Sequence, residues 1–108
     1  MYKMAVVGDR ESVLIFKAFG VEVFGVDVTE ALENQKLINR LAKEGYAVIL
    51  ITEQAAQYLL ETLEHYRKEV LPAVMIIPSG DAALGIAEKL MKQNVERAVG
   101  VDILQPEN

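Results

Sequence analysis

Residues 47–52 read AVILIT, an unbroken apolar run that closes on a threonine and is followed by Glu53. A strand with apolar side chains on both faces is typical of a parallel sheet covered by helices on both sides. Two more short runs rich in valine and isoleucine, Met4–Val7 and Ala73–Pro78, are almost as continuously apolar. The start of Val21–Val26 alternates between apolar and polar residues, which favours an edge strand with one wetter face. The sequence therefore predicts a parallel sheet of four strands.

Helical patterns occupy the segments between these strands. Ser12–Phe19, Thr29–Glu44 and Glu53–Tyr66 carry apolar residues at helical spacing. Thr29 is expected to cap the second helix, and Gly45 follows its end. Strands that alternate with helices in this way predict an α/β fold, with the four-stranded parallel sheet flanked by helices in a Rossmann-like or receiver-like arrangement.

The core is expected to form where strand side chains meet the flanking helices. The strand residues predicted to be buried are Ala5, Val7, Val23, Val48, Leu50, Val74 and Ile76. The helices are expected to pack Leu41 and Leu63 against them. The apolar stripe of the third helix is predicted to contain Ala56, Leu59, Leu60, Leu63 and Tyr66.

The last part of the chain differs from the rest. We expect residues 1–78 to form the α/β core domain and residues 79–108 to form a hinge, an additional C-terminal helix (about Ile86–Val99) and a polar tail. Small residues in Ser79–Ala83 would let this helix detach and dock again. Spacings of three and four predict a partner-binding seam of Leu84, Ala87, Met91, Asn94, Val95 and Ala98. Periodicity leaves open whether the helix binds a partner or covers its own sheet.

Length, composition and charge exclude several classes of protein. A chain of 108 residues is one domain by size. Its net charge of −5 argues against a nucleic-acid partner, because phosphate binding needs clustered lysine and arginine. Cysteine is absent, so disulfides and thiolate metal sites are impossible. No apolar run is long enough to insert into a membrane, so a membrane process would involve this chain through partners.

The loops after the strands would hold a ligand in this fold. The first loop, Gly8–Ser12, lacks the further glycines of a dinucleotide fingerprint and the lysine of a P-loop. Its two carboxylates, Asp9 and Glu11, would repel a phosphate. The third strand ends in Thr52 and Glu53, where a receiver domain needs its phosphoacceptor aspartate. The sequence therefore predicts neither nucleotide binding nor phosphotransfer.

Other polar residues have simpler roles than catalysis. Asp9, Thr52 and Ser79 are predicted to cap helices or turns. His65 is the chain's one histidine and lies at a helix end, where a cation stabilises the helix dipole. No nucleophile lies in a pattern with a general base, so we predict no catalytic residues, no cofactor and no metal site.

Several stretches occur together in a fixed order: YKMAVVGD at 2–9, SVL at 12–14 with FK at 16–17, AVILITE at 47–53, LPA at 71–73, IPS at 77–79, Gly85, and VERAVGVDIL at 95–104. In this order they resemble the F subunit of the V-type and archaeal-type (A-type) rotary ATPases over nearly the whole chain. Ile15 departs from the pattern, since many relatives carry a smaller residue there, and this concerns packing alone.

The resemblance implies a non-catalytic subunit of the central rotor stalk. Such a subunit would bind the helical hairpin of the D subunit of the stalk and act on the catalytic head subunits. It would modulate ATP hydrolysis or synthesis coupled to H⁺ or Na⁺ transport, partly through a C-terminal helix that can reposition. It would be cytoplasmic and peripheral to the membrane through the complex. The alternative from the residues alone is a free-standing ligand-binding domain or a degenerate receiver-like signalling domain.

Overall fold

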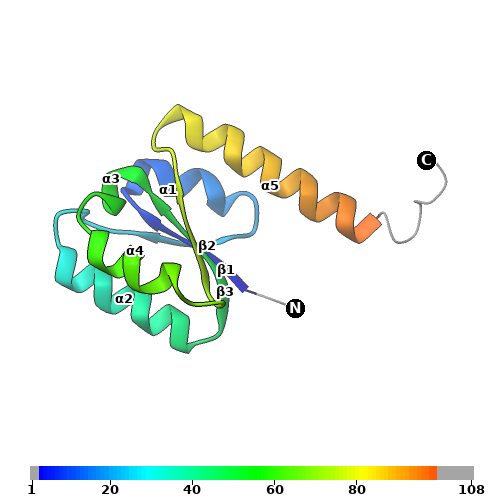
Figure 1. The fold of residues 1–108 in the computed structure, drawn as a ribbon. Coiled ribbons are helices and arrows are strands. Elements are labelled where there is room, and N and C mark those ends of the chain that lie inside the picture. Colours follow the sequence, from blue (N-terminus) through cyan, green and yellow to red (C-terminus); the bar gives the residue numbers. More distant parts are fainter. Residues whose placement is uncertain (1–2, 100–108) are drawn as a thin grey trace.

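The computed structural model describes residues 3–99, with side chains described through Lys89 and at Lys92. Its sheet has four strands: β1 (Lys3–Gly8), β2 (Glu22–Gly25), β3 (Tyr46–Thr52) and β4 (Ala73–Ile77). Every neighbouring pair is parallel, and the strand order is β2-β1-β3-β4. The predicted α/β fold, its parallel sheet and the edge position of the second strand are confirmed (Figure 1).

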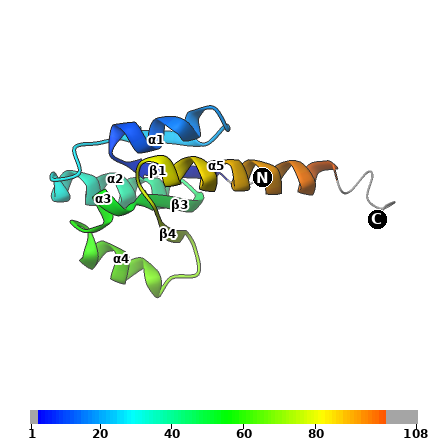
Figure 2. The same cartoon turned by 90° about the horizontal axis from the view of Figure 1, so that it is seen from above.

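The helices form one layer on each face of the sheet (Figure 2). On one face lie α1 (Arg10–Lys17) and the first part of α5 (Asp81–Val99), the additional C-terminal helix that the sequence predicts. On the other face lie α2 (Ala31–Lys43), α3 (Glu53–Ala56) and α4 (Leu60–Arg67). The central strands β1 and β3 are buried between the two layers because their side chains are apolar on both faces.

Each layer has its own apolar core. The core under α2, α3 and α4 is the larger, and it includes Ala5, Val7, Ile38, Leu41, Ile49 and Ile51. The core under α1 and α5 includes Val6, Val13, Phe16, Leu50, Ala83 and Ala87. The predicted burial of Ala5, Val7, Leu50 and Leu41 is confirmed.

The fourth strand is less covered than its apolar sequence predicts. Ile76 is 55% exposed and Met75 is 52% exposed, so the prediction that Ile76 lies in the core is wrong. The reason is that β4 forms the second edge of the sheet, and its outer side has no neighbouring strand. Four other residues predicted to be in the core are only partly buried: Val23, Val48, Val74 and Leu63.

The predicted helix Glu53–Tyr66 is two helices with a break between them. The chain leaves α3 through tight turns, in which Tyr58 N donates to Ala55 O at 3.1 Å and Leu59 N donates to Ala56 O at 2.9 Å. These bonds to the third residue back rotate the apolar stripe relative to a continuous helix. Leu59 is therefore buried as predicted, whereas Leu60 is 68% exposed, so its predicted place in the apolar stripe is wrong.

Asp27 forms a turn before α2 with Thr29, the residue that the sequence predicts as the cap of this helix. The backbone N–H and the hydroxyl of Thr29 both donate to Asp27 Oδ1, at 3.0 and 2.7 Å. The helix itself begins later, and Glu30 at the N-cap makes no side-chain bond. The prediction that Thr29 caps this helix is wrong, because a side chain of the Asx type bonds the backbone two residues on and competes for the turn.

Candidate protein interface

The start of α5 is bonded to the start of α1, 68 residues earlier in the chain. Ser12 Oγ donates to Asp9 Oδ2 at 2.6 Å and accepts from the backbone N–H of Gly80 at 2.8 Å. Asp9 is also the N-cap of α1, because its carboxylate accepts from Ser12 N at 3.3 Å. The predicted cap at Asp9 is confirmed, and one buried serine links it to the C-terminal helix.

Ser79 adds a second link to the same place. Its hydroxyl donates to Asp9 Oδ1 at 3.4 Å and accepts from Gln54 N, in the first turn of α3, at 3.3 Å. Thr52 stands at the N-cap of α3 without a side-chain bond, and its buried hydroxyl has no hydrogen-bond partner among the described residues. The prediction that Thr52 caps with its side chain is therefore wrong. We call Asp9, Ser12, Ser79 and Gly80 the Asp9 cluster.

The Asp9 cluster favours the charged form of its carboxylate. Partial burial alone would raise the pKa of Asp9, but the bonds from the Ser12 side chain and from the backbone at the start of α1 outweigh it. The nearby Thr52 hydroxyl acts in the same direction, although its geometry falls short of a hydrogen bond. The pKa of Asp9 is held below its usual 3.8. This stabilisation is present above pH 3.8 and is lost as the pH falls through the lower pKa of the folded state.

We predict that Ser12→Ala lowers the free energy of unfolding by about 1–2 kcal/mol at pH 7, because Gly80 N–H and Asp9 each lose a partner. Urea titration measures this loss. The pKa of Asp9 should also return toward its usual value in the variant, so acid should destabilise Ser12→Ala less steeply than the parent protein. Equal acid sensitivity in the two proteins would contradict the role of Ser12.

The first two turns of α5 belong to the core. Ala83 and Ala87 are fully buried against α1 and the sheet, and Ile86 is partly buried beside them. Leu84 is 44% exposed and remains open to a partner. Of the predicted seam, Ala87 is thus covered while α5 is docked. The predicted division of the chain at residue 78 stays a prediction, and this burial favours a boundary further along.

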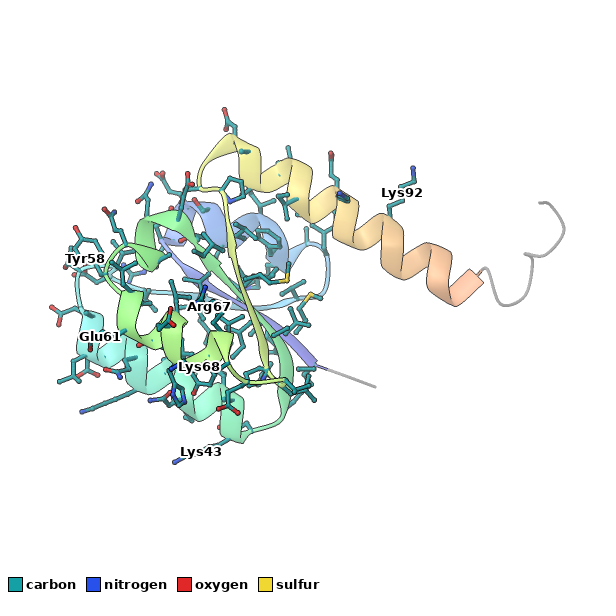
Figure 3. The ribbon with its side chains drawn as sticks, in the orientation of Figure 1. Lys43, Tyr58, Glu61, Arg67, Lys68 and Lys92 are labelled. Carbon is teal, nitrogen blue, oxygen red and sulfur yellow. The ribbon has the colours of Figure 1, made fainter. Side chains whose placement is uncertain are left out.

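The second half of α5 extends past the rest of the body in both views (Figures 1 and 2). Lys92 lies on this part and points away from the sheet (Figure 3). The other seam residues, Met91, Asn94, Val95 and Ala98, belong to this stretch of helical backbone, and their side chains lie outside the described ones. Their contact with a partner stays a prediction. Among the described residues, no helix combines the length and apolar composition needed to cross a bilayer.

A second surface was missed by reasoning from the sequence. A groove of about 420 Å³ runs between the start of α2 and the segment that joins α3 to α4. Its lining comprises Ala31, Leu32, Gln35 and residues 57–62. Leu32 and Leu60 are both exposed there, and the break after α3 turns Leu60 outward. Helical periodicity placed Leu60 in the inward stripe, so only the position of the break could have identified this groove, which we call the α2–α4 groove.

The polar side chains at the carboxyl edge of the sheet, where this fold would hold a ligand, are bonded within the protein. Asp9, Ser12 and Ser79 direct their polar atoms at one another and at backbone groups. Among the described side chains, those of residues 3–89 and Lys92, no three of histidine, aspartate or glutamate lie where they could share a metal ion. The arrangement joins the starts of α1, α3 and α5.

Comparison with known proteins gives a consistent result over the length of the chain. The family model of the ATP synthase (F/14-kDa) subunit matches residues 4–95. A V-type ATP synthase F subunit of Clostridium botulinum is 52% identical over 102 residues, which cover 94% of this chain and 97% of that relative. The protein of the same name from Clostridium perfringens is 51% identical over 96% of this chain and 98% of its own. An A-type ATP synthase F subunit of Methanocaldococcus jannaschii is 33% identical over 94% of this chain and 98% of its own.

Proposed function

The chain belongs to the ATP synthase F subunit family of the V-type ATPases, and from this premise we propose that it is a non-catalytic subunit of the central rotor stalk. It binds the helical hairpin of the D subunit and modulates ATP hydrolysis or synthesis in the catalytic head, coupled to transport of H⁺ or Na⁺. It is located on the cytoplasmic side and associates with the membrane through the complex.

The observation that carries this proposal is a helix with two different halves. The first half of α5 is anchored by the Asp9 cluster and by Ala83 and Ala87. The backbone of the second half extends past the rest of the body (Figure 1). A helix that is fixed at one end and free along the other can reach another subunit while the body stays attached elsewhere. Its exposed Leu84 marks where such a contact would begin.

The carboxyl edge of the sheet supports a role without catalysis. In an open parallel sheet a ligand would meet the loops after β1 and β3. Here Asp9 lies in the loop after β1, its carboxylate accepts bonds from Ser12 and Ser79, and its pKa is lowered, so it is ionised at neutral pH. A carboxylate there repels a nucleotide, and ATP binding therefore belongs to other subunits of the complex.

We predict that the full chain forms a stable one-to-one complex with the isolated helical-hairpin subunit. Size-exclusion chromatography with light scattering, at micromolar concentrations, measures the stoichiometry. A thermal scan with ATP, ADP and common metabolites should leave the melting temperature of the chain unchanged. Failure to form the complex, together with stabilisation by a small ligand, would instead support a free-standing ligand-binding domain.

A further inference from the structure

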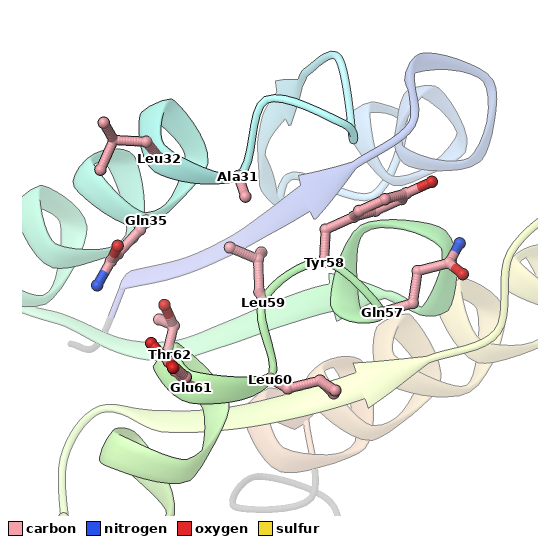
Figure 4. A pocket seen from close by; sticks show the side chains of 9 residues that line it. All are labelled: Ala31, Leu32, Gln35, Gln57, Tyr58, Leu59, Leu60, Glu61 and Thr62. Atoms are coloured by element: carbon pink, nitrogen blue, oxygen red, sulfur yellow. The ribbon is translucent and has the colours of Figure 1, made fainter.

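The α2–α4 groove lies on the face of the sheet opposite α1 and α5. Figure 4 shows Leu59 at its centre, between the starts of α2 and α4, with Leu32, Tyr58 and Leu60 set around it. Leu59 is buried and forms the floor. Leu32 and Leu60 are 63% and 68% exposed, and Tyr58 is 45% exposed. Two leucines and a tyrosine thus surround a shallow apolar floor.

Exposed apolar side chains gathered around a concave surface mark a contact, whereas single exposed ones are ordinary. Leu14 on α1 illustrates the ordinary case, because it is 63% exposed and does not line this groove. In the α2–α4 groove, three such residues come from two segments that are far apart in the chain. Tyrosine and leucine around a floor of this kind fit the apolar face of a helix, which inserts side chains at spacings of three and four.

Charges around the groove indicate what kind of helix fits. Glu61 is part of the lining, while Glu30 and Glu33 flank its α2 side and are exposed. Lys36, one turn after Glu33 on α2, is the basic residue nearest to these two glutamates in the sequence. The rim is therefore net acidic, as is the whole chain at −5. A partner with lysine or arginine beside its apolar stripe would be complementary, and one with carboxylates would be repelled.

We propose that the α2–α4 groove docks an amphipathic helix of another subunit of the same complex, whose apolar stripe is flanked by basic residues. The inference rests on the proposed function and adds a second contact to it. Docking here is separate from α5, because the sheet lies between the two surfaces. The body is then held by the groove while the second half of α5 remains free to act.

The test uses the full chain and the rotary ATPase complex purified from cells that lack this subunit. Affinity is measured for the parent chain and for Leu60→Asn, Leu32→Asn and Leu14→Asn. The first two changes alter the groove, and Leu14→Asn is the matched control on the other face, with the same exposure as Leu32. Because all three side chains are exposed, circular dichroism and melting temperature should stay close to those of the parent.

We expect each groove variant to bind at least about tenfold more weakly and the control to stay within about twofold of the parent. Glu61→Lys should also weaken binding, and it should reduce the loss of affinity that salt causes. The matched charge control is Glu11→Lys on α1, which is exposed on the opposite face and should leave both properties unchanged.

Parent and groove variants that bind equally well would overturn the inference and leave the proposed function standing. A parent chain that does not bind the depleted complex would refute the proposed function itself. Self-association of the isolated chain that Leu60→Asn abolishes would show that the groove serves a second copy, and saturable small-molecule binding lost in Leu60→Asn would show a ligand site. Either of those two results would also overturn the inference.

Discussion

Replacing Gly8 with alanine is expected to lower the free energy of unfolding by about 3 kcal/mol, at the upper end of what overpacking a core costs. Gly8 ends β1 beside the end of β3. A Cβ atom there would lie 2.0 Å from Thr52 Oγ1 and 2.5 Å from Thr52 Cγ2. Thr52 is fully buried and stiff at χ1, so it cannot turn aside without moving the strand. Urea denaturation of the full chain measures the loss.

Two further variants make the Gly8 result specific. Gly85→Ala is the matched control, because a Cβ at Gly85 meets nothing within 4 Å and α5 should gain up to about 1 kcal/mol of helix stability. In a Thr52→Ala background, Gly8→Ala should cost less than in the parent, since two of the three closest atoms are gone. A loss below about half a kcal/mol for Gly8→Ala alone would contradict the close packing of β1 against Thr52.

Ending the chain at Ser79 is expected to cost at least about 3–5 kcal/mol, as much as truncating a large core side chain. The cut removes Ala83 and Ala87, which cover Phe16 and Leu50, and it removes the Gly80 N–H that bonds Ser12. Since domains of this size have total stabilities of about 5–15 kcal/mol, the shortened chain should be close to unfolding at room temperature. Circular dichroism with urea measures the change.

The matched truncation ends at Lys89, after the buried turns of α5. It keeps Ala83, Ala87 and every bond of the Asp9 cluster. We expect this chain to fold with nearly the stability of the parent, because it lacks only the half of α5 that leaves the body. If the chain ending at Ser79 is as stable as the one ending at Lys89, the independent body ends near residue 78, as the sequence alone suggests.

The sheet could be predicted from the sequence because β1 and β3 are apolar on both faces, which leaves a central parallel position as the natural interpretation. The same argument fails for β4. Its run of valine, methionine and isoleucine looks equally buried, and only the strand order shows that it is an edge with Ile76 exposed. Continuous apolar composition identifies a strand, but it does not tell how many neighbours the strand has.

The C-terminal helix α5 could be predicted from the periodicity of its sequence, but the α2–α4 groove could not be predicted. The turn between Ala56 and Leu60 could not, because an apolar stripe carries no signal for a change from bonds to the fourth residue to bonds to the third. The Asp9 cluster is equally hidden, since it joins Ser12 to Gly80 across 68 positions of the chain. A capping residue can be recognised from the neighbouring sequence, whereas a bonding partner far along the chain cannot.

Under the proposed function, the groove on one face attaches the body to the complex, and the second half of α5 contacts the head. The Asp9 cluster holds the start of α5 on the opposite face of the sheet. This division predicts that attachment and modulation can be separated by truncation.

The most direct test is ATP turnover by the complex that lacks this subunit, measured after adding the full chain or the chain that ends at Lys89. The account predicts that both chains bind one-to-one and that the full chain changes the turnover rate. The chain ending at Lys89 should leave the rate close to that of the depleted complex. A full chain that incorporates without altering turnover, or a Lys89 truncation that alters it as strongly as the full chain, would contradict the account.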